Sequence, residues 1–182
     1  MHVFKDSRWT PCACLKTKRK RDALKDAGVT GAPKELRRWC DGFASWARAA
    51  VRRNCGVSVL RGTPSQVMEA ANTLAALAAK TGTSRAVKLS DLVDDCFDRE
   101  RKKGRFKTQP AFMVIICGVE PPHSYNGPTL FSLVTRRRMA GLPTVIATTA
   151  PLHRLYGEAA TESLGENGEA ATFNIEANEV DE

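Results

Sequence analysis

The 182-residue chain is long enough for one domain with a hydrophobic core and too short for two of ordinary size. Hydrophobic residues make up 42% and charged residues 26%, which excludes wholesale disorder. The net charge of +8 is concentrated near the N-terminus, because residues 1–61 hold 15 of the 28 lysines and arginines but 5 of the 20 acidic residues. Such a region fits nucleic acid first, then an acidic protein surface or an anionic membrane, with a merely solvated basic helix as the alternative.

Composition also indicates a cytoplasmic protein. The N-terminal stretch MHVFKDSRW has charges where a signal peptide needs an apolar segment. No apolar run approaches the roughly 18 residues of a membrane span, so we expect no membrane partner. The six cysteines are spread without the spacing of a small disulfide framework, and we expect most of them to be reduced core thiols.

Two helices are predicted in the first third of the chain. Residues 15–27 are strongly basic and suited to a helix, which two glycines and a proline in 28–33 should end. Residues 35–54 place aromatic residues and alanines at helical spacing with arginines opposite. We expect this second, amphipathic helix to be interrupted or capped near Asp41 and Gly42.

Strands and helices then alternate from Val57 to Thr149. Short β-rich or apolar runs predict strands, and the runs between them predict helices. The strands are expected within 56–60, 85–89, 111–119 and 141–151, and the helices within 66–80, 90–105 and 129–140. This alternation is typical of a parallel sheet with right-handed crossovers. A helix within 152–164 and a strand within 171–177 complete the predicted order.

Five stretches carry a resemblance to a known family: CACLKTKRKRDALKDAGV, GVSVLRG, AVKLSDLVDD, FMVIICGV and VTRRRMAGLPTVIATT. In this order they resemble the DnaC/IstB family of AAA+ ATPases, the helicase loaders of bacteria and phages and the related transposition helpers. The resemblance runs from about Cys12 to about Thr149. It implies a three-layer α/β/α P-loop (AAA+-like) parallel sheet, and this chain has no clear helical lid in its sequence. The implied division is a basic extension with a partial cysteine motif (1–33), a P-loop domain (34–176) and an acidic tail (177–182).

The chemical residues of the family's phosphate-binding loop are replaced in this chain. A Walker A loop, Gly-x-x-x-x-Gly-Lys-Ser/Thr, holds phosphates and magnesium with glycine amides, a lysine and a hydroxyl. Here the pattern begins at Gly62 and ends in Val67, Met68 and Glu69, with Ser65 where the loaders have a further glycine. Loss of the lysine removes a contact of roughly 1.5 to 3 kcal/mol. A carboxylate about 4 Å from a polyphosphate repels it by roughly 4 kcal/mol.

Other nucleotide-site positions are altered as well. Glu69, if it lies in the first turn of a helix, could itself satisfy the amides that a phosphate would; the alternative is a side chain that faces solvent. Cys117 and Gly118 stand where the family's Walker B strand has two acids, and neither can hold hydrated Mg²⁺. Glu120 is the nearest substitute. In the sensor strand Thr148 and Thr149 remain, but Ala150 replaces the polar residue that follows them in the family.

The best binding candidates are cations of the first predicted helix and the segment after it, which suit nucleic-acid phosphates without reading base sequence. They are Lys16, Lys18, Arg19, Lys20, Arg21, Lys25, Arg37 and Arg38. In the family this region also meets the replicative helicase. A second group, residues 136–138, is interpreted as structural or subunit contacts. Trp39 and Trp46 could stack on bases, although core packing is the favoured interpretation.

Neither a zinc site nor a thiol enzyme is expected. Cys12 and Cys14 resemble half of the zinc module that opens some loaders, and two thiolates do not close a tetrahedral site, so we interpret them as a remnant. Cys117 with His123 would be a candidate catalytic pair. However, Cys117 ends a buried strand, and no residue can be identified that would orient the histidine.

The five stretches stand in the order of the family, but the residues that would bind nucleotide are replaced. Together these features predict a pseudo-ATPase related to the helicase loaders of DNA replication. It would bind DNA, in particular single strands, the replicative helicase or an active loader paralogue, without hydrolysing ATP. No catalytic residue, cofactor or metal is expected. Two alternatives stay open: a weak nucleotide-binding, DNA-dependent ATPase of the same family, and a truncated or decayed open reading frame without activity.

Overall fold

The computed structural model describes residues 2–5, 8–11, 13–29, 33–52, 56–80, 82, 84–94, 113–117, 126–158 and 171–175. Its helices are α1 (Ala13–Asp26), the 3-10 helix η1 (Leu36–Arg38), α2 (Phe43–Arg52), α3 (Pro64–Ala78), α5 (Asn126–Met139) and α6 (Leu152–Tyr156). Residues 89–94 are also helical. Its strands are β1 (His2–Lys5), β2 (Arg8–Pro11), β3 (Val57–Arg61), β4 (Ser84–Lys88), β5 (Met113–Cys117), β6 (Thr144–Thr148) and β7 (Ala171–Asn174).

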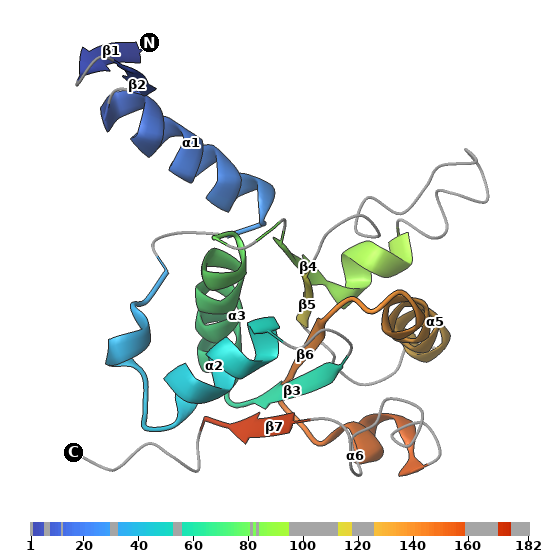
Figure 1. The fold of residues 1–182 in the computed structure, drawn as a ribbon. Coiled ribbons are helices and arrows are strands. Elements are labelled where there is room, and N and C mark those ends of the chain that lie inside the picture. The colour runs from blue at the N-terminus through green and yellow to red at the C-terminus, as the bar shows by residue number, and fades with distance from the viewer. Residues whose placement is uncertain are drawn as a thin grey trace.

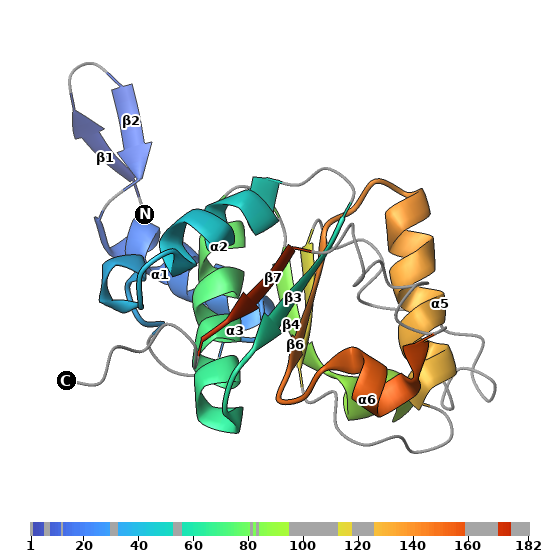
Figure 2. The same cartoon turned by 90° about the horizontal axis from the view of Figure 1, so that it is seen from below.

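A five-stranded parallel sheet forms the middle layer of the protein, with the strand order β4-β5-β6-β3-β7. Helices α2 and α3 cover one face of the sheet, and α5 and α6 cover the other (Figures 1 and 2). Central strand β6 is buried along its whole length, which explains why its sequence is continuously apolar or small. The predicted three-layer α/β/α architecture is therefore confirmed.

Two hydrophobic cores lie on opposite faces of the sheet, because successive strand residues point to opposite sides. Leu60 of β3 packs into the core under α2 and α3, whereas Val57 and Val59 of the same strand join the core under α5 and α6. Helix α3 contributes mainly alanines to the first core, and four of them are at most 1% exposed. Such small side chains let the helix lie close to the sheet.

An aromatic cluster packs α2 against the edge strand β7. The ring centroid of Phe43 lies 4.5 Å from that of Trp39, 5.9 Å from that of Trp46 and 5.6 Å from that of Phe173. Phe43 itself is fully buried. The indole Nε1 of Trp39 donates a hydrogen bond of 3.3 Å to Thr73 Oγ1 on α3. Core packing is thus confirmed for both tryptophans.

Helix α1 is attached to the sheet by its C-terminal end. It ends in a Schellman motif, in which Gly28 adopts a φ of +73° and the amide of Val29 donates to Leu24 O at 3.0 Å. Ala27 is 1% exposed, and its carbonyl accepts a 2.8 Å hydrogen bond from Ala86 N of edge strand β4. From this attachment α1 projects away from the body of the protein (Figure 1).

A β-hairpin at the far end of α1 was not expected from the sequence. Strands β1 and β2 pair antiparallel, with Val3 opposite Thr10 and Phe4 opposite Trp9. These four residue types favour strands, but each of the two strands is only four residues long, which is too short for a clear sequence pattern. None of the described helices is long and apolar enough to cross a membrane.

Candidate functional site

The turn between β3 and α3 is the place where a P-loop would bind phosphate. In that motif a glycine-rich loop separates the strand from the helix. Here β3 ends at Arg61 and α3 begins at Pro64, so Gly62 and Thr63 alone connect them. Positions Pro64 to Glu69, which match the rest of the Walker A pattern, are all wound into α3.

The first turn of α3 is closed by a capping box formed by Thr63 and Gln66. The amide of Gln66 donates to Thr63 Oγ1 at 3.4 Å, and the amide of Thr63 donates to Gln66 Oε1 at 2.9 Å. Pro64 has no N–H to offer. Of the backbone donors at this helix N-terminus, the amides of Thr63 and Gln66 are therefore bound within the protein, and the donor at Pro64 is missing.

This geometry corrects the interpretation of Glu69 as the group that satisfies these amides. Glu69 lies beyond the first turn of α3, and no acidic residue is found in that turn. Its side chain is exposed. The cap is made by neutral groups instead, and the solvent-facing alternative holds for Glu69.

Side chains also close over Gly62. A Cβ built on this glycine would lie 3.1 Å from Gln66 Oε1 and 3.3 Å from both Cβ and Cδ1 of Ile175. Ile175 is fully buried, and its amide donates to Arg61 O at 2.8 Å, which fixes it beside the turn. Burial also lowers the pKa of Arg61, a cation at the end of β3 that is not among the predicted site residues. The space into which a side chain of Gly62 would extend is occupied by the protein itself.

The remaining nucleotide-site positions on α3 do not converge on one point. Val67 is 3% exposed and packs with Leu60 in the core under α2 and α3. Ser65 is exposed, and Met68 is 37% exposed. Since consecutive residues of a helix point in different directions, Val67 faces the core while Ser65 and Met68 face solvent.

The other two predicted nucleotide-site segments follow β5 and β6, at the carboxyl ends of these parallel strands. Cys117 is the last residue of β5 and stands in register with Lys88 of β4, while Gly118 lies outside the described residues. Thr148, at the end of β6, is 1% exposed. Its hydroxyl donates to Ala150 O at 2.8 Å and accepts from Ala150 N at 3.2 Å. The sensor-strand hydroxyl therefore stabilises its own turn.

Replacing Thr63 with alanine is expected to lower the free energy of unfolding by about 1 kcal/mol, because the cap of α3 is lost. The melting temperature of a protein of this size should then fall by roughly 2–4 °C. Thermal unfolding followed by circular dichroism measures this. Thr63→Ser, which keeps the hydroxyl, should stay near the parent protein, and an equal loss in both variants would contradict the role of the cap.

The predicted cations on the first helix are all on α1, and Arg37 and Arg38 are on η1. Lys18, Arg21 and Lys25 are exposed and recur at helical spacing on one side of α1; we call them the basic stripe. The side chains of Lys16, Arg19 and Lys20 lie outside the described part of the chain. Arg37 Nε pairs with Glu35 Oε2 at 2.6 Å, which reduces its availability to a ligand.

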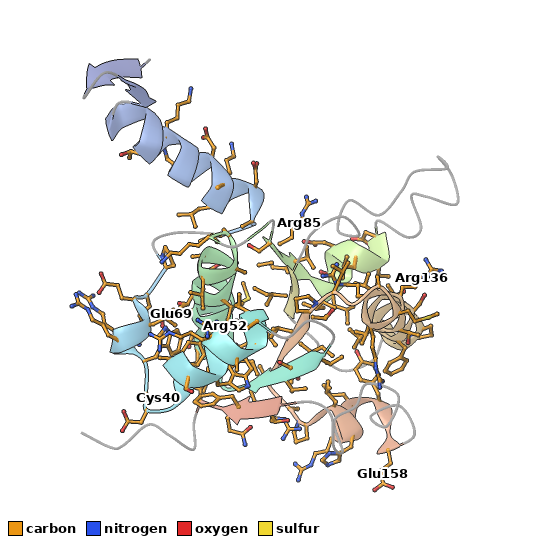
Figure 3. All side chains as sticks on the ribbon, viewed as in Figure 1. Cys40, Arg52, Glu69, Arg85, Arg136 and Glu158 are labelled. Carbon is orange, nitrogen blue, oxygen red and sulfur yellow. The ribbon has the colours of Figure 1, made fainter. Side chains whose placement is uncertain are left out.

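The second basic group divides into one buried residue and two exposed ones. Arg137 is 2% exposed; its Nε donates to Thr144 Oγ1 and its Nη2 to Pro143 O, both at 3.0 Å. Burial lowers the pKa of its guanidinium to about 10. Arg136 points outward from α5 (Figure 3), and Arg138 is also exposed. The predicted structural role is therefore confirmed for Arg137, which joins the end of α5 to the start of β6.

The predicted cysteine remnant is only partly described. Cys12 lies outside the described residues, and Cys14 is the second residue of α1. Among the described residues, no three His, Cys, Asp or Glu side chains come together as metal ligands. His123, the candidate partner of Cys117, also lies outside them.

Comparison with known proteins identifies the fold of the chain. No protein-family model matches the sequence, and a search of the curated proteins finds no match. Among solved structures, the chain is similar to the DnaC helicase loader, with a TM-score of 0.56 and 17% identity over 86% of this chain and 99% of that one. The fold is that of the helicase loaders. DnaI is similar too, with a TM-score of 0.52 and 14% identity over 85% of this chain and 93% of that one.

A third solved structure with this helicase-loader fold is longer. A DNA replication initiation factor matches with a TM-score of 0.62 and 9% identity over 77% of this chain. The match covers 48% of that protein, so this chain spans about half of its length. At these identities the likeness establishes the fold, and the α/β architecture with a five-stranded parallel sheet is the part of the prediction that it confirms.

Proposed function

We propose that this protein is a helicase-loader-related accessory of DNA replication that acts by binding, as a pseudo-ATPase without nucleotide or magnesium. The observation that carries the proposal is the turn of two residues between β3 and α3. A triphosphate would have to displace Gln66 from its cap and enter the space that Ile175 occupies beside Gly62. It would gain no lysine in return, because Met68 stands at that position.

The basic stripe on α1 supports nucleic acid as one partner. Lys18, Arg21 and Lys25 are exposed on a helix that projects from the body, so a flexible strand can reach them (Figure 1). Cations in this arrangement neutralise phosphates and do not read bases. We therefore propose single-stranded DNA as the nucleic-acid ligand. The fold shared with the DnaC helicase loader supports a replicative helicase, or an active loader of the same fold, as the protein partner.

Calorimetric titration of ATP with Mg²⁺ into the full chain tests the absence of nucleotide binding. We expect no saturable heat up to about 1 mM ATP, and hence a dissociation constant weaker than about 1 mM. The melting temperature should not rise with ATP, because a ligand at 100 times its dissociation constant would stabilise the folded state by about 2.7 kcal/mol. A loader with an intact Walker A sequence serves as the positive control. Micromolar binding, or phosphate release above background, would overturn the proposal.

A further inference from the structure

A cavity of about 480 Å³ lies between α1, residues 33–36 and the C-terminal half of α3. It is at the end of α3 opposite the capped turn, and most of its lining is apolar. Leucines come from all three sides: Leu24 from α1, Leu36 from η1 and Leu77 from α3, each of them half-buried. We call this cavity the α1–α3 groove.

The charged side chains that line the groove give its rim a net positive charge. Lys34 and Lys80 line it, and the Lys34 ammonium lies 4.5 Å from the centre of the Trp39 ring. Glu35, the acidic residue of the lining, pairs with Arg37 at 2.6 Å, so its charge is balanced locally. An occupant that matches this groove therefore has an apolar body with negative charges beside it.

We propose that the α1–α3 groove receives an acidic amphipathic helix of a protein partner. A groove walled by two helices and lined by leucines suits a third helix, whose apolar residues at i, i+3 or i+4, and i+7 enter it. Burying the exposed parts of Leu24, Leu36 and Leu77 provides the apolar gain. Acidic residues that flank this apolar face would lie next to Lys34 and Lys80, which sets the orientation and the charge of the partner.

The groove and the basic stripe share one helix. Leu24 lines the groove, whereas Lys18 and Lys25 lie together on another side of α1, with Lys18 opposite the buried Ala27. A partner helix in the groove would hold α1 against α3 and so restrict the arm that carries the stripe. If the proposed nucleic-acid function holds, partner and DNA then bind to α1 with reciprocal coupling.

Synthetic helical peptides of about 14 residues test the groove without any nucleic acid, so the result is independent of the proposed function. Two peptides carry leucines at i, i+3 and i+7 or at i, i+4 and i+7, with glutamates elsewhere, and two matched peptides carry lysines in place of the glutamates. Fluorescence anisotropy with the full chain should give a dissociation constant of about 1–100 μM for the best acidic peptide and at least about tenfold weaker binding for its basic match.

Variants that place a negative charge in the groove, compared with one that places it elsewhere, provide a second test. Ala23 is exposed and lines the groove, so Ala23→Glu should weaken acidic-peptide binding about tenfold or more without unfolding the protein. Lys80→Glu should do the same. Ala49→Glu adds the same charge on an exposed position of α2 outside the groove and should leave binding unchanged. Circular dichroism verifies that each variant is folded.

Several results would overturn the proposal. One is that no acidic peptide binds more tightly than about 500 μM, or that acidic and basic peptides bind alike. Another is that Ala23→Glu and Ala49→Glu behave identically. Peptide binding that requires removal of residues 177–182 would assign the groove to the chain's own acidic tail. A dimer in solution that Ala23→Glu dissociates would assign it to a second copy of the chain.

Discussion

Replacing Lys18, Arg21 and Lys25 together with alanine is expected to weaken the binding of single-stranded DNA about 100-fold at 0.1 M salt. Each phosphate contact releases about 0.7 of a counterion from a single strand, so three lost contacts reduce the slope of log K against log salt by about 2. The three side chains are exposed, and their removal should leave the fold intact. Anisotropy of a labelled oligonucleotide, titrated at several salt concentrations, measures both quantities.

A control with the same change of net charge separates the basic stripe from the overall charge of the protein. Arg48, Arg52 and Lys88 are exposed cations that are not on α1; two lie on α2 and one at the end of β4. Their joint replacement with alanine should change the salt slope by much less than the stripe variant does. Equal effects of the two triple variants would show that DNA responds only to net charge, and the assignment of the stripe would be wrong.

Replacing Phe43 with alanine is expected to lower the free energy of unfolding by about 3–5 kcal/mol. Phe43 is fully buried and contacts Trp39, Trp46 and Phe173, so its removal leaves a cavity where α2 meets β7. Domains are typically stable by only about 5–15 kcal/mol, so this variant should be close to unfolding at physiological temperature. Urea denaturation followed by tryptophan fluorescence and circular dichroism provides the measurement.

Two further variants show whether burial causes the loss. Phe43→Leu retains most of the apolar volume and should lose clearly less stability than Phe43→Ala. Met139→Ala removes a large apolar side chain that is 85% exposed, so its effect should stay within about 0.5 kcal/mol. A loss in Phe43→Ala no greater than that in Met139→Ala would contradict the role of the aromatic cluster.

Local patterns were sufficient to predict most of the sheet and its covering helices. Strands β5 and β6 are continuous apolar runs, and α3 is rich in alanine, so each element follows from residues near in sequence. The amphipathic helix over 35–54 breaks at Asp41 and Gly42, as expected, into η1 and α2. The hairpin of β1 and β2 was missed because two strands of four residues carry little signal.

The start of α3 was predicted at residue 66, two residues later than it occurs, because Gly62 was compared with the first glycine of a loop. The sequence contained a better signal. Thr63 and Gln66 have the spacing of a capping box, and Pro64 stands at the first helical position, where proline is favoured. By contrast, the closure of Gly62 by Ile175 joins segments more than a hundred residues apart, and no local pattern could have predicted it.

The attachment of α1 to β4 has a consequence for how the protein could be re-engineered. A Cβ on Gly28 would lie 2.5 Å from Ala86 O, and the positive φ of this residue is itself unfavourable for other residue types. Any side chain there must shift the helix relative to the strand. Gly28 therefore fixes the direction of α1 relative to β4. Substituting this one residue would change the direction in which α1 and its hairpin project, while every charge that these elements carry stays the same.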